Sequence, residues 1–449
     1  MVPGPRLLFA LCILAGAGEL AGATRAITSY NDAKPILESQ RANLPPALRE
    51  PTPAKWSAWT QSQDKAIRAR LEQGDLDSMV NLLLLGTSFT HQPRVRVESL
   101  GEASTSGVLR ARVDDLVAGL RNPRDNERLT FLAGLLRRKG VDPTASSAAG
   151  VFLYDNLERV LKERAALAER ARQSAGQDVL DRSSLFSDRG VSLDTSILPD
   201  FALDRTLADL RTRGVLHEGQ VLRAAVIGPG LDFIDKREES GYDYYPQQTV
   251  QPFALYDSLA RLGLARLPGL SLGIFDISAR VIDHLERARK RGTYVIQLPR
   301  DVDRPWPPEL VAYWRSLGDH AGASTPPIRP PEIFQGLETR AVRIRPEIVL
   351  ACEPVDLNIV LERLSLPAAQ RYDLIVATNI FVYYDTFQQA LALANIGAML
   401  KPGGVLLTND KLPEAPGGAM RHAGTTIVRS ADGGLLDAVG WYQRNNGGN

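Results

Sequence analysis

Residues 224–235 read AAVIGPGLDFID, an apolar run that breaks into Gly228, Pro229 and Gly230. A short apolar run bounded by glycine and proline is typical of a buried β-strand that ends in a turn. Glycine after a strand also lets the backbone approach a ligand closely, because no side chain stands in the way. The stretch therefore predicts a strand followed by a ligand-binding turn.

Around and beyond this stretch, β-type runs alternate with helical ones. This alternation predicts a parallel sheet with helices on both faces. Two further β-type runs, 425–429 and 435–444, flank an Ala-Asp-Gly-Gly turn and predict a terminal antiparallel hairpin. The other predicted strands are 222–227, 271–275, 372–378 and 405–409, and the predicted helices are 249–264, 279–291 and 387–400.

The chain before residue 174 is helical in pattern. Tyr154, Leu157 and Leu161 recur at three- and four-residue steps, while charged residues fill the other faces, as in an amphipathic helix. The expected helices are 56–72, 76–85, 107–121, 126–139 and 148–173. We therefore expect three parts after residue 23, namely an all-α domain at 24–173, a linker at 174–201 and an α/β domain at 202–449.

Acidic residues follow the second predicted strand, 271–275, and a third strand that we expect within IVLACEPVDLN at 348–358. Asp276 ends the run LSLGIFD, and an acid at that place can accept both hydroxyls of a ribose. Such charge-assisted bonds are worth about 1.5–3 kcal/mol, or roughly ten- to a hundredfold in affinity. Asp356, in IVLACEPVDLN, can reach an adenine amine, and Glu353 competes for that role.

Together these features resemble the class I S-adenosylmethionine (SAM) dependent methyltransferases. The matching marks are the Gly-x-Gly turn, the acid after strand two, YDLIVATN at 372–379, KPGG at 401–404 and the final hairpin, over residues 222–444. The resemblance implies a Rossmann-like seven-stranded sheet with a terminal antiparallel hairpin, preceded by the all-α domain. It also implies SAM as the cofactor and a methyl acceptor that the sequence does not name.

The resemblance assigns site residues as well. The glycines would lie beside the methionine portion and the ribose, the first acid on the ribose diol, and the second acid near the adenine. The implied cofactor-binding residues are Gly228, Gly230, Asp276, Ile277, Asp356 and Asn379. The candidates for catalysis, which would face the substrate, are Asn379, Tyr383 and Tyr384.

Two positions of the glycine turn depart from the family pattern. Val226 stands where an acid usually precedes the first glycine, and Asp232 stands where a third glycine follows the second. The missing acid removes a partner for the methionine amino group, and Asp232 or Asp235 is the alternative partner. A nicotinamide-binding fold competes with this interpretation, but it wants an acid about 20 residues on, whereas Asp276 lies 48 residues beyond Gly228.

Two long loops interrupt the α/β pattern, at 231–248 and 297–339. Loops of this length are usually functional or disordered. The first contains Tyr242, Tyr244 and Tyr245, and aromatic faces attract a cationic sulfonium. This loop is therefore either a lid over the cofactor or a segment that its tyrosines pack against the sheet.

The first 23 residues have the layout of a secretory signal peptide. Arg6 precedes an apolar core at 7–17, and a small-residue end comes before Thr24. The core is shorter than the ~20 residues needed to span a bilayer, so no transmembrane anchor is expected after cleavage. We expect export to the periplasm or the medium, and a cytoplasmic protein if this segment is not a signal peptide.

Composition narrows the classes of function. The 53 lysines and arginines nearly cancel the 52 aspartates and glutamates, so the chain has no basic field to attract nucleic acid. Only Cys352 remains after cleavage, and the five histidines have no ligand-like spacing, so we expect neither an internal disulfide nor a metal site. The sequence indicates no oligomeric state.

Two functions of different class follow from these observations. The first is a SAM-dependent methyltransferase whose helical domain selects or positions the acceptor. That layout, with FVYYD at 381–385 after strand four, is loosely similar to the chemotaxis-receptor methyltransferases. The second is an exported, non-catalytic binding or structural protein that retains the methyltransferase fold, because SAM is a cytoplasmic metabolite and the chain begins like an exported one.

Overall fold

The computed structural model describes most of the chain after residue 22. Residues 1–22 of the predicted signal peptide (1–23), residues 174–196 of the predicted linker (174–201), Asp235 and Tyr242 lie outside the described residues. The described residues are 23–96, 99, 103–173, 197–234, 243–302, 305–332, 336–414, 418–430 and 433–446.

A seven-stranded sheet forms the centre of the α/β part, in the order β7-β3-β2-β9-β10-β12-β11. The first five strands of that order run parallel, and β12 and β11 add an antiparallel hairpin at one side. The strands are β2 (Arg223–Ile227), β3 (Ser271–Asp276), β7 (Cys352–Asp356), β9 (Tyr372–Ala377), β10 (Leu400–Thr408), β11 (Met420–Arg429) and β12 (Leu435–Arg444). The predicted parallel sheet and terminal hairpin are confirmed.

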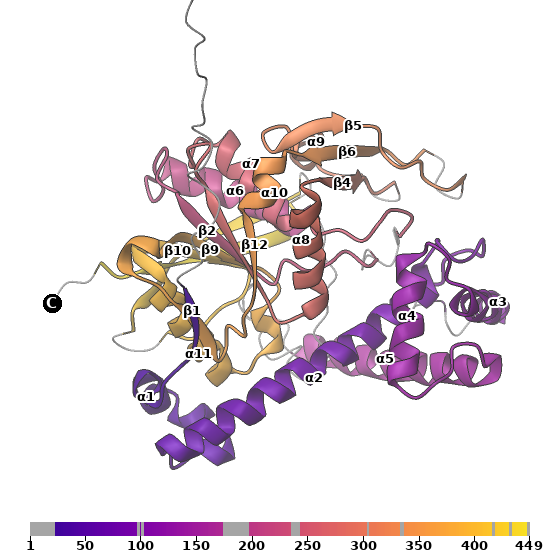
Figure 1. Cartoon of the computed structure of the whole chain (residues 1–449), viewed down its shortest axis with the longest axis horizontal. Coiled ribbons are helices and arrows are strands. Elements are labelled where there is room, and N and C mark those ends of the chain that lie inside the picture. Colours follow the sequence, from indigo (N-terminus) through magenta and orange to yellow (C-terminus); the bar gives the residue numbers. More distant parts are fainter. Residues whose placement is uncertain are drawn as a thin grey trace, which may run out of the picture.

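Alternate residues of the central strands face opposite layers of helices, as a buried parallel sheet requires. In β2, Ala224 and Val226 join a core with helices α6, α7 and α8, whereas Ala225 and Ile227 join a second core with α1 and α11. Figure 1 shows the sheet between these two layers. The helices are α1 (Tyr30–Ser39), α6 (Ile197–Thr212), α7 (Gln251–Arg261), α8 (Ala279–Arg291) and α11 (Thr386–Met399).

The chain before α1 is also attached to the α/β part. Strand β1 (Thr24–Ile27) pairs antiparallel with β8 (Glu362–Ser365). Among the described residues, short 3-10 helices lie at Arg41–Asn43, Pro46–Leu48, Ala368–Gln370 and Phe381–Tyr383. The first strand and first helix therefore pack on the sheet rather than on the helical bundle.

Helix α2 (Pro53–Leu85) is continuous over 33 residues, where the sequence pattern predicted two helices. Its first turns pack on α11, with the rings of Trp59 and Phe387 5.4 Å apart. Its last turns form a separate core with α3 (Ala103–Arg121), α4 (Glu127–Arg138) and α5 (Ser146–Gln173). Figure 1 shows α2 extending from the sheet to this bundle.

The predicted long loop at 297–339 contains regular structure. Strands β4 (Tyr294–Pro299), β6 (Thr339–Ile344) and β5 (Gly322–Thr325) form a small antiparallel sheet, with α9 (Pro308–Ser316) between β4 and β5. A short α10 (Pro346–Ala351) leads into β7. Tyr313 and Trp314 of α9 are buried in the core under the sheet, so this segment is an ordered insertion rather than a loop.

Candidate functional site

The sequence-predicted residues gather where the parallel strands end. Parallel strands place their carboxyl ends at one edge of the sheet, which is where α/β proteins bind ligands. Gly228 follows β2, Asn379 comes two residues after β9, and Asp276 lies directly opposite Asp356 at the ends of β3 and β7. The chain therefore brings the predicted glycines, acids and asparagine to one edge.

The glycine turn has the backbone conformation that glycine permits. Gly228 and Gly230 have φ angles of +63° and +74°, a left-handed region that other residues adopt at a cost. The Gly228 amide donates to the Phe275 carbonyl at 2.7 Å, which fixes the turn against β3. A Cβ atom on Gly228 would meet the Cδ1 atom of Ile380 at 2.1 Å, so the side chain of Ile380 occupies the space over this glycine.

Asp276 is almost fully buried at the end of β3. Its Oδ1 accepts a hydrogen bond from the Ser278 amide at 2.7 Å. Burial raises the pKa of Asp276 to about 7, the amides of Ser278 and Ile277 lower it, and the neighbouring carboxylate of Asp356 raises it further. The carboxyl group thus changes its charge near neutral pH.

Of the two acids on β7, only Asp356 lies at the carboxyl edge. Glu353 pairs with Gly273, three residues back along the sheet, and burial raises its pKa. Asp356 is half exposed, with 47% of its side chain accessible. The geometry therefore favours Asp356 over Glu353 as the acid that can face a ligand at this edge.

Helix α2 crosses this edge and contacts the predicted site residues. Arg68 donates to the Ile277 carbonyl at 3.1 Å and to Asp356 Oδ1 at 2.8 Å. One turn earlier, Asp64 accepts from the Asn358 side chain at 2.8 Å. Two atoms expected to face an adenine are thus hydrogen-bonded by the protein's own arginine.

The apolar side of α2 packs into the core at this edge of the sheet. Ile67 is completely buried and packs in the core that contains Ile227, Phe275 and Leu357. Burying an isoleucine side chain stabilises the folded protein by about 1.5–3 kcal/mol, whereas an exposed ion pair stabilises it by about 0–1 kcal/mol. Since the Arg68 side chain is still 29% exposed, Ile67 contributes more than Arg68 to holding α2 in place.

Asn379 presents an exposed side chain beside the glycine turn. It has a positive φ of 58°, which asparagine tolerates better than most residues. Its amide donates to Asn409 Oδ1 at 2.7 Å, and Asn409 Nδ2 donates to Asn379 Oδ1 at 2.9 Å. This reciprocal pair joins the ends of β9 and β10 and fixes the orientation of the Asn379 side chain.

The two tyrosines after β9 differ in their surroundings. Tyr384 is buried in the core beside α11, and burial raises the pKa of its hydroxyl. Tyr383 is partly exposed, and its carbonyl accepts from Arg70 of α2 at 2.6 Å. Asn379 and Tyr383 are therefore the more accessible of the three catalytic candidates.

The departures from the glycine pattern have structural roles. Val226 is fully buried under the sheet. Asp232 accepts from the Tyr245 hydroxyl at 2.7 Å and from Gln248 Nε2 at 3.3 Å, and its backbone pairs with Gln248. Asp232 thus joins the start of the loop that follows β2 to its end, and its side chain is already hydrogen-bonded within that loop.

That loop also joins the sheet to the helical bundle. Arg128 of α4 donates to the carbonyls of Phe233 and Tyr245 and lies 5.8 Å from the Tyr245 ring. Tyr245 is buried, with the Tyr244 ring packed edge-on against it. For Tyr244 and Tyr245 the contacts favour packing over the role of a lid.

The arrangement at the sheet edge decides the fold. Five parallel strands with a Gly-x-Gly turn after β2, an acid after β3 and a terminal antiparallel hairpin match each structural feature that the resemblance implied. The α/β part of the chain has the class I methyltransferase fold.

Comparisons with known proteins give a consistent list of methyltransferase structures. No protein-family model and no curated protein matches the chain. Among solved structures, magnesium protoporphyrin IX methyltransferase from Synechocystis PCC 6803 with bound SAM is 10% identical, with a TM-score of 0.27, over 56% of this chain and 81% of that one. The glycopeptide N-methyltransferase MtfA complexed with sinefungin is 11% identical, with a TM-score of 0.27, over 55% of this chain and 94% of that one. A TehB-like SAM-dependent methyltransferase from Corynebacterium glutamicum is 11% identical, with a TM-score of 0.25, over 63% and 97%.

The acids at this edge of the sheet have the chemistry that an adenosyl group needs, but the space over the glycine turn is filled. Asp276 and Asp356 are one strand apart, about 4.8 Å in a sheet, which suits a ribose and its base. Ile67 is buried in the core that contains residues of the strand ends, and Ile380 occupies the space over Gly228.

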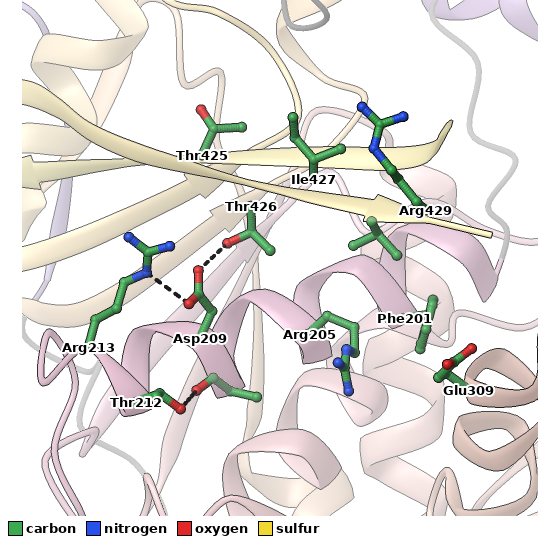
Figure 2. Close-up of a pocket in the computed structure, with 12 residues that line it drawn as sticks. Phe201, Arg205, Asp209, Thr212, Arg213, Glu309, Thr425, Thr426, Ile427 and Arg429 are labelled. Carbon is green, nitrogen blue, oxygen red and sulfur yellow. Dashed lines mark hydrogen bonds and ion pairs between the residues drawn. The ribbon is translucent and has the colours of Figure 1, made fainter. Parts of the chain in front are cut away.

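A pocket of about 540 Å³ lies elsewhere, between α6 and β11 (Figure 2). Asp209 on its floor accepts from Arg213 Nε and from Thr426 Oγ1, each at 2.8 Å. Arg205 and Arg429 point in opposite directions in Figure 2, so the cations of this pocket do not converge. None of the sequence-predicted site residues lines it.

Two groups near the edge were missed by the sequence reasoning. Asp200 on α6 is buried, and burial raises its pKa to about 7 while a hydrogen bond with the Gln251 side chain lowers it. Gln251, at the start of α7, donates to the Thr378 hydroxyl beside Asn379 at 2.9 Å. No spacing in the sequence marks either residue, because Asp200 lies in the segment predicted as a linker and Gln251 lies near the start of a predicted helix that carries no motif.

The described residues contain neither a helix that could span a membrane nor a cluster that could hold a metal ion. None of the described helices combines the length and apolar character needed to span a membrane. Within the same part of the chain, no cluster of three or more histidine, cysteine or acidic side chains is placed to hold a metal ion.

Proposed function

We propose that this protein is a SAM-dependent methyltransferase acting on an acceptor that is still to be identified. The observation that carries the proposal is the pair Asp276 and Asp356, held in register beside the Gly228–Gly230 turn. Two carboxylates at adjacent strand ends give acceptors for ribose hydroxyls and for an adenine amine. Bound SAM supplies a methyl group activated by its sulfonium.

The chain's own residues would bind and orient the reactants. The glycine turn would contact the cofactor through its backbone, and Asn379, fixed by Asn409, would present an exposed amide toward an acceptor. Positioning of this kind is the main contribution an enzyme makes to an in-line methyl transfer. The bundle of α3, α4 and α5, joined to this edge through α2, is placed to help select the acceptor.

A titration tests this proposal directly. SAM added to purified protein spanning residues 24–449 is expected to bind one-to-one with a micromolar Kd in a calorimeter, and S-adenosylhomocysteine (SAH) is expected to compete. No heat and no change in melting temperature at millimolar SAM would contradict the proposal. That outcome would favour the non-catalytic alternative, which is supported by the filling of the edge by Ile67 and by the engagement of Asp232 within its own loop.

We also propose that the protein is exported after cleavage before Thr24. The proposal rests on the Arg6 start, the apolar core and the small-residue end of the first 23 residues. N-terminal sequencing of the protein from its native host is expected to begin at Thr24. A mature chain that retains Met1 and fractionates with the cytoplasm would contradict export.

A further inference from the structure

We propose that the middle of α2 is a strap that occupies the cofactor site and has to leave it before SAM binds. The strap consists of Asp64, Ile67, Arg68 and Leu71, which lie on one face of the helix. This inference rests on the proposed function, because it describes how access to that same site is controlled.

The strap uses the hydrogen-bond acceptors that an adenine would use. Arg68 donates to Asp356 Oδ1, the acceptor expected to face the adenine, and to the carbonyl of Ile277, another expected cofactor-binding residue. An adenine amine is a donor of the same kind, so the guanidinium and the base compete for one place. Arg68 is therefore an internal competitor of the cofactor.

The strap also fills the volume that the cofactor needs. Ile67 is completely buried in the core that also contains Ile227, Phe275 and Leu357 from the strand ends. Asp276, whose carboxylate a ribose must reach, is also almost fully buried. Both the polar contacts and the space are taken by one helical turn.

The ion pair in the middle of α2 is more exposed to water than the contacts nearer the two ends of the helix. Trp59 packs on Phe387 at one end, and near the other end Asp75 accepts from Arg280 at 2.8 Å with a side chain that is only 14% exposed. In the middle, the Arg68 and Asp356 side chains are 29% and 47% exposed, so water competes for their ion pair. The strap can therefore yield to a ligand while the ends of the helix stay attached.

Variants of the strap test this proposal by SAM titration of the chain from residue 24. Arg68→Ala removes the competing donor. Asp64→Asn weakens the ion pair through which Asp64 supports Arg68, and it keeps the length of the side chain. Both are expected to lower the Kd for SAM by about two- to tenfold, the range for loss of one partly exposed ion pair. Lys65→Ala, an exposed lysine on the same helix, is the matched control and is expected to leave the Kd unchanged.

Hydrogen exchange gives a second readout that does not depend on turnover. Saturating SAH is expected to increase amide exchange in peptides covering residues 62–72, because the strap leaves the edge. Circular dichroism confirms that each variant is folded.

The possible outcomes separate the strap from the proposed function. Wild-type binding with equal or weaker binding by both strap variants, and with greater protection of residues 62–72, overturns the strap alone. No binding by the wild type, Arg68→Ala or Asp64→Asn overturns the proposed function and the strap together. Tighter binding by both strap variants than by the wild type, with faster exchange of residues 62–72 in SAH, supports both.

Discussion

Asp276→Asn is expected to weaken SAM binding by roughly ten- to a hundredfold, the effect of losing a charge-assisted pair of bonds to a ribose diol. The amide keeps an oxygen that can accept from the Ser278 amide, so the turn before α8 survives while the second acceptor is lost. Calorimetric titration of wild type and variant measures the ratio of the two Kd values. Asp283→Asn, an exposed acid on α8, is the control and is expected to change nothing.

The same residue gives SAM binding a pH dependence. Because burial raises the pKa of Asp276 to about 7, the carboxyl is protonated at pH 6 and ionised at pH 8. SAM is expected to bind more tightly at pH 8, where the carboxylate accepts both hydroxyls, and this rise should vanish in Asp276→Asn. Equal pH profiles for wild type and variant would show that Asp276 does not contact the cofactor.

The stability of the folded protein is expected to change with pH in the direction opposite to SAM binding. A carboxyl whose pKa is raised by folding holds its proton longer in the folded state than in the unfolded state. Its contribution to stability is complete below the ordinary pKa of 3.8 and is lost as the pH rises through about 7. Asp276→Asn is therefore expected to be more stable than wild type at pH 8, so any loss of binding there cannot be ascribed to unfolding.

Arg112→Leu is expected to cost about 3–5 kcal/mol of unfolding free energy in the helical bundle, the range for breaking a buried charged hydrogen-bond network. Arg112 on α3 is completely buried and donates to the carbonyls of Leu83 and Gly86, at the end of α2, and of Gln92 and Pro93. Burial lowers its pKa to about 10, so it stays charged at neutral pH. Without it, four carbonyls lose their donor.

Urea unfolding followed by circular dichroism measures this effect. Arg110→Leu, an exposed arginine on the same helix, is the control and is expected to change stability by less than about 0.5 kcal/mol, as surface substitutions do. Similar midpoints for the two variants would show that water replaces the guanidinium of Arg112.

Local patterns predicted the sheet because each strand carries its own information. The runs around Ala225, Ile274 and Ile375 are continuously apolar, as strands buried on both faces must be, and glycine or acid marks their ends. Helix α8 occupies the predicted residues 279–291, because Gly292 adopts the left-handed conformation that ends it. The β4-β6-β5 sheet escaped prediction, since prolines in the connecting segment read as loop.

The predicted ends of helices were wrong where tertiary contacts override the local sequence pattern. Helix α6 begins at Ile197, inside the segment predicted as linker, because Phe201 and its neighbours pack into the core under the sheet. Helix α2 continues through Gly74, a residue that weakens a helix, since its two halves are each buried against a different core.

The residues that make up the candidate site could be predicted from the sequence, but the helix that covers them could not. The residues at the strand ends follow from strand order, which places Asp276 and Asp356 side by side. Arg68 lies 288 residues from Asp356 in the sequence, and no local pattern relates them. The contact exists because α2 is long enough to cross from α11 to the helical bundle.

A crystal structure of residues 24–449 with SAH tests the central claim most directly. We predict SAH at the carboxyl edge, with its ribose on Asp276 and its adenine near Asp356, and with Arg68 and Ile67 withdrawn from the positions they hold here. Saturating SAH that leaves this edge empty, with Arg68 still bonded to Asp356, would contradict the claim.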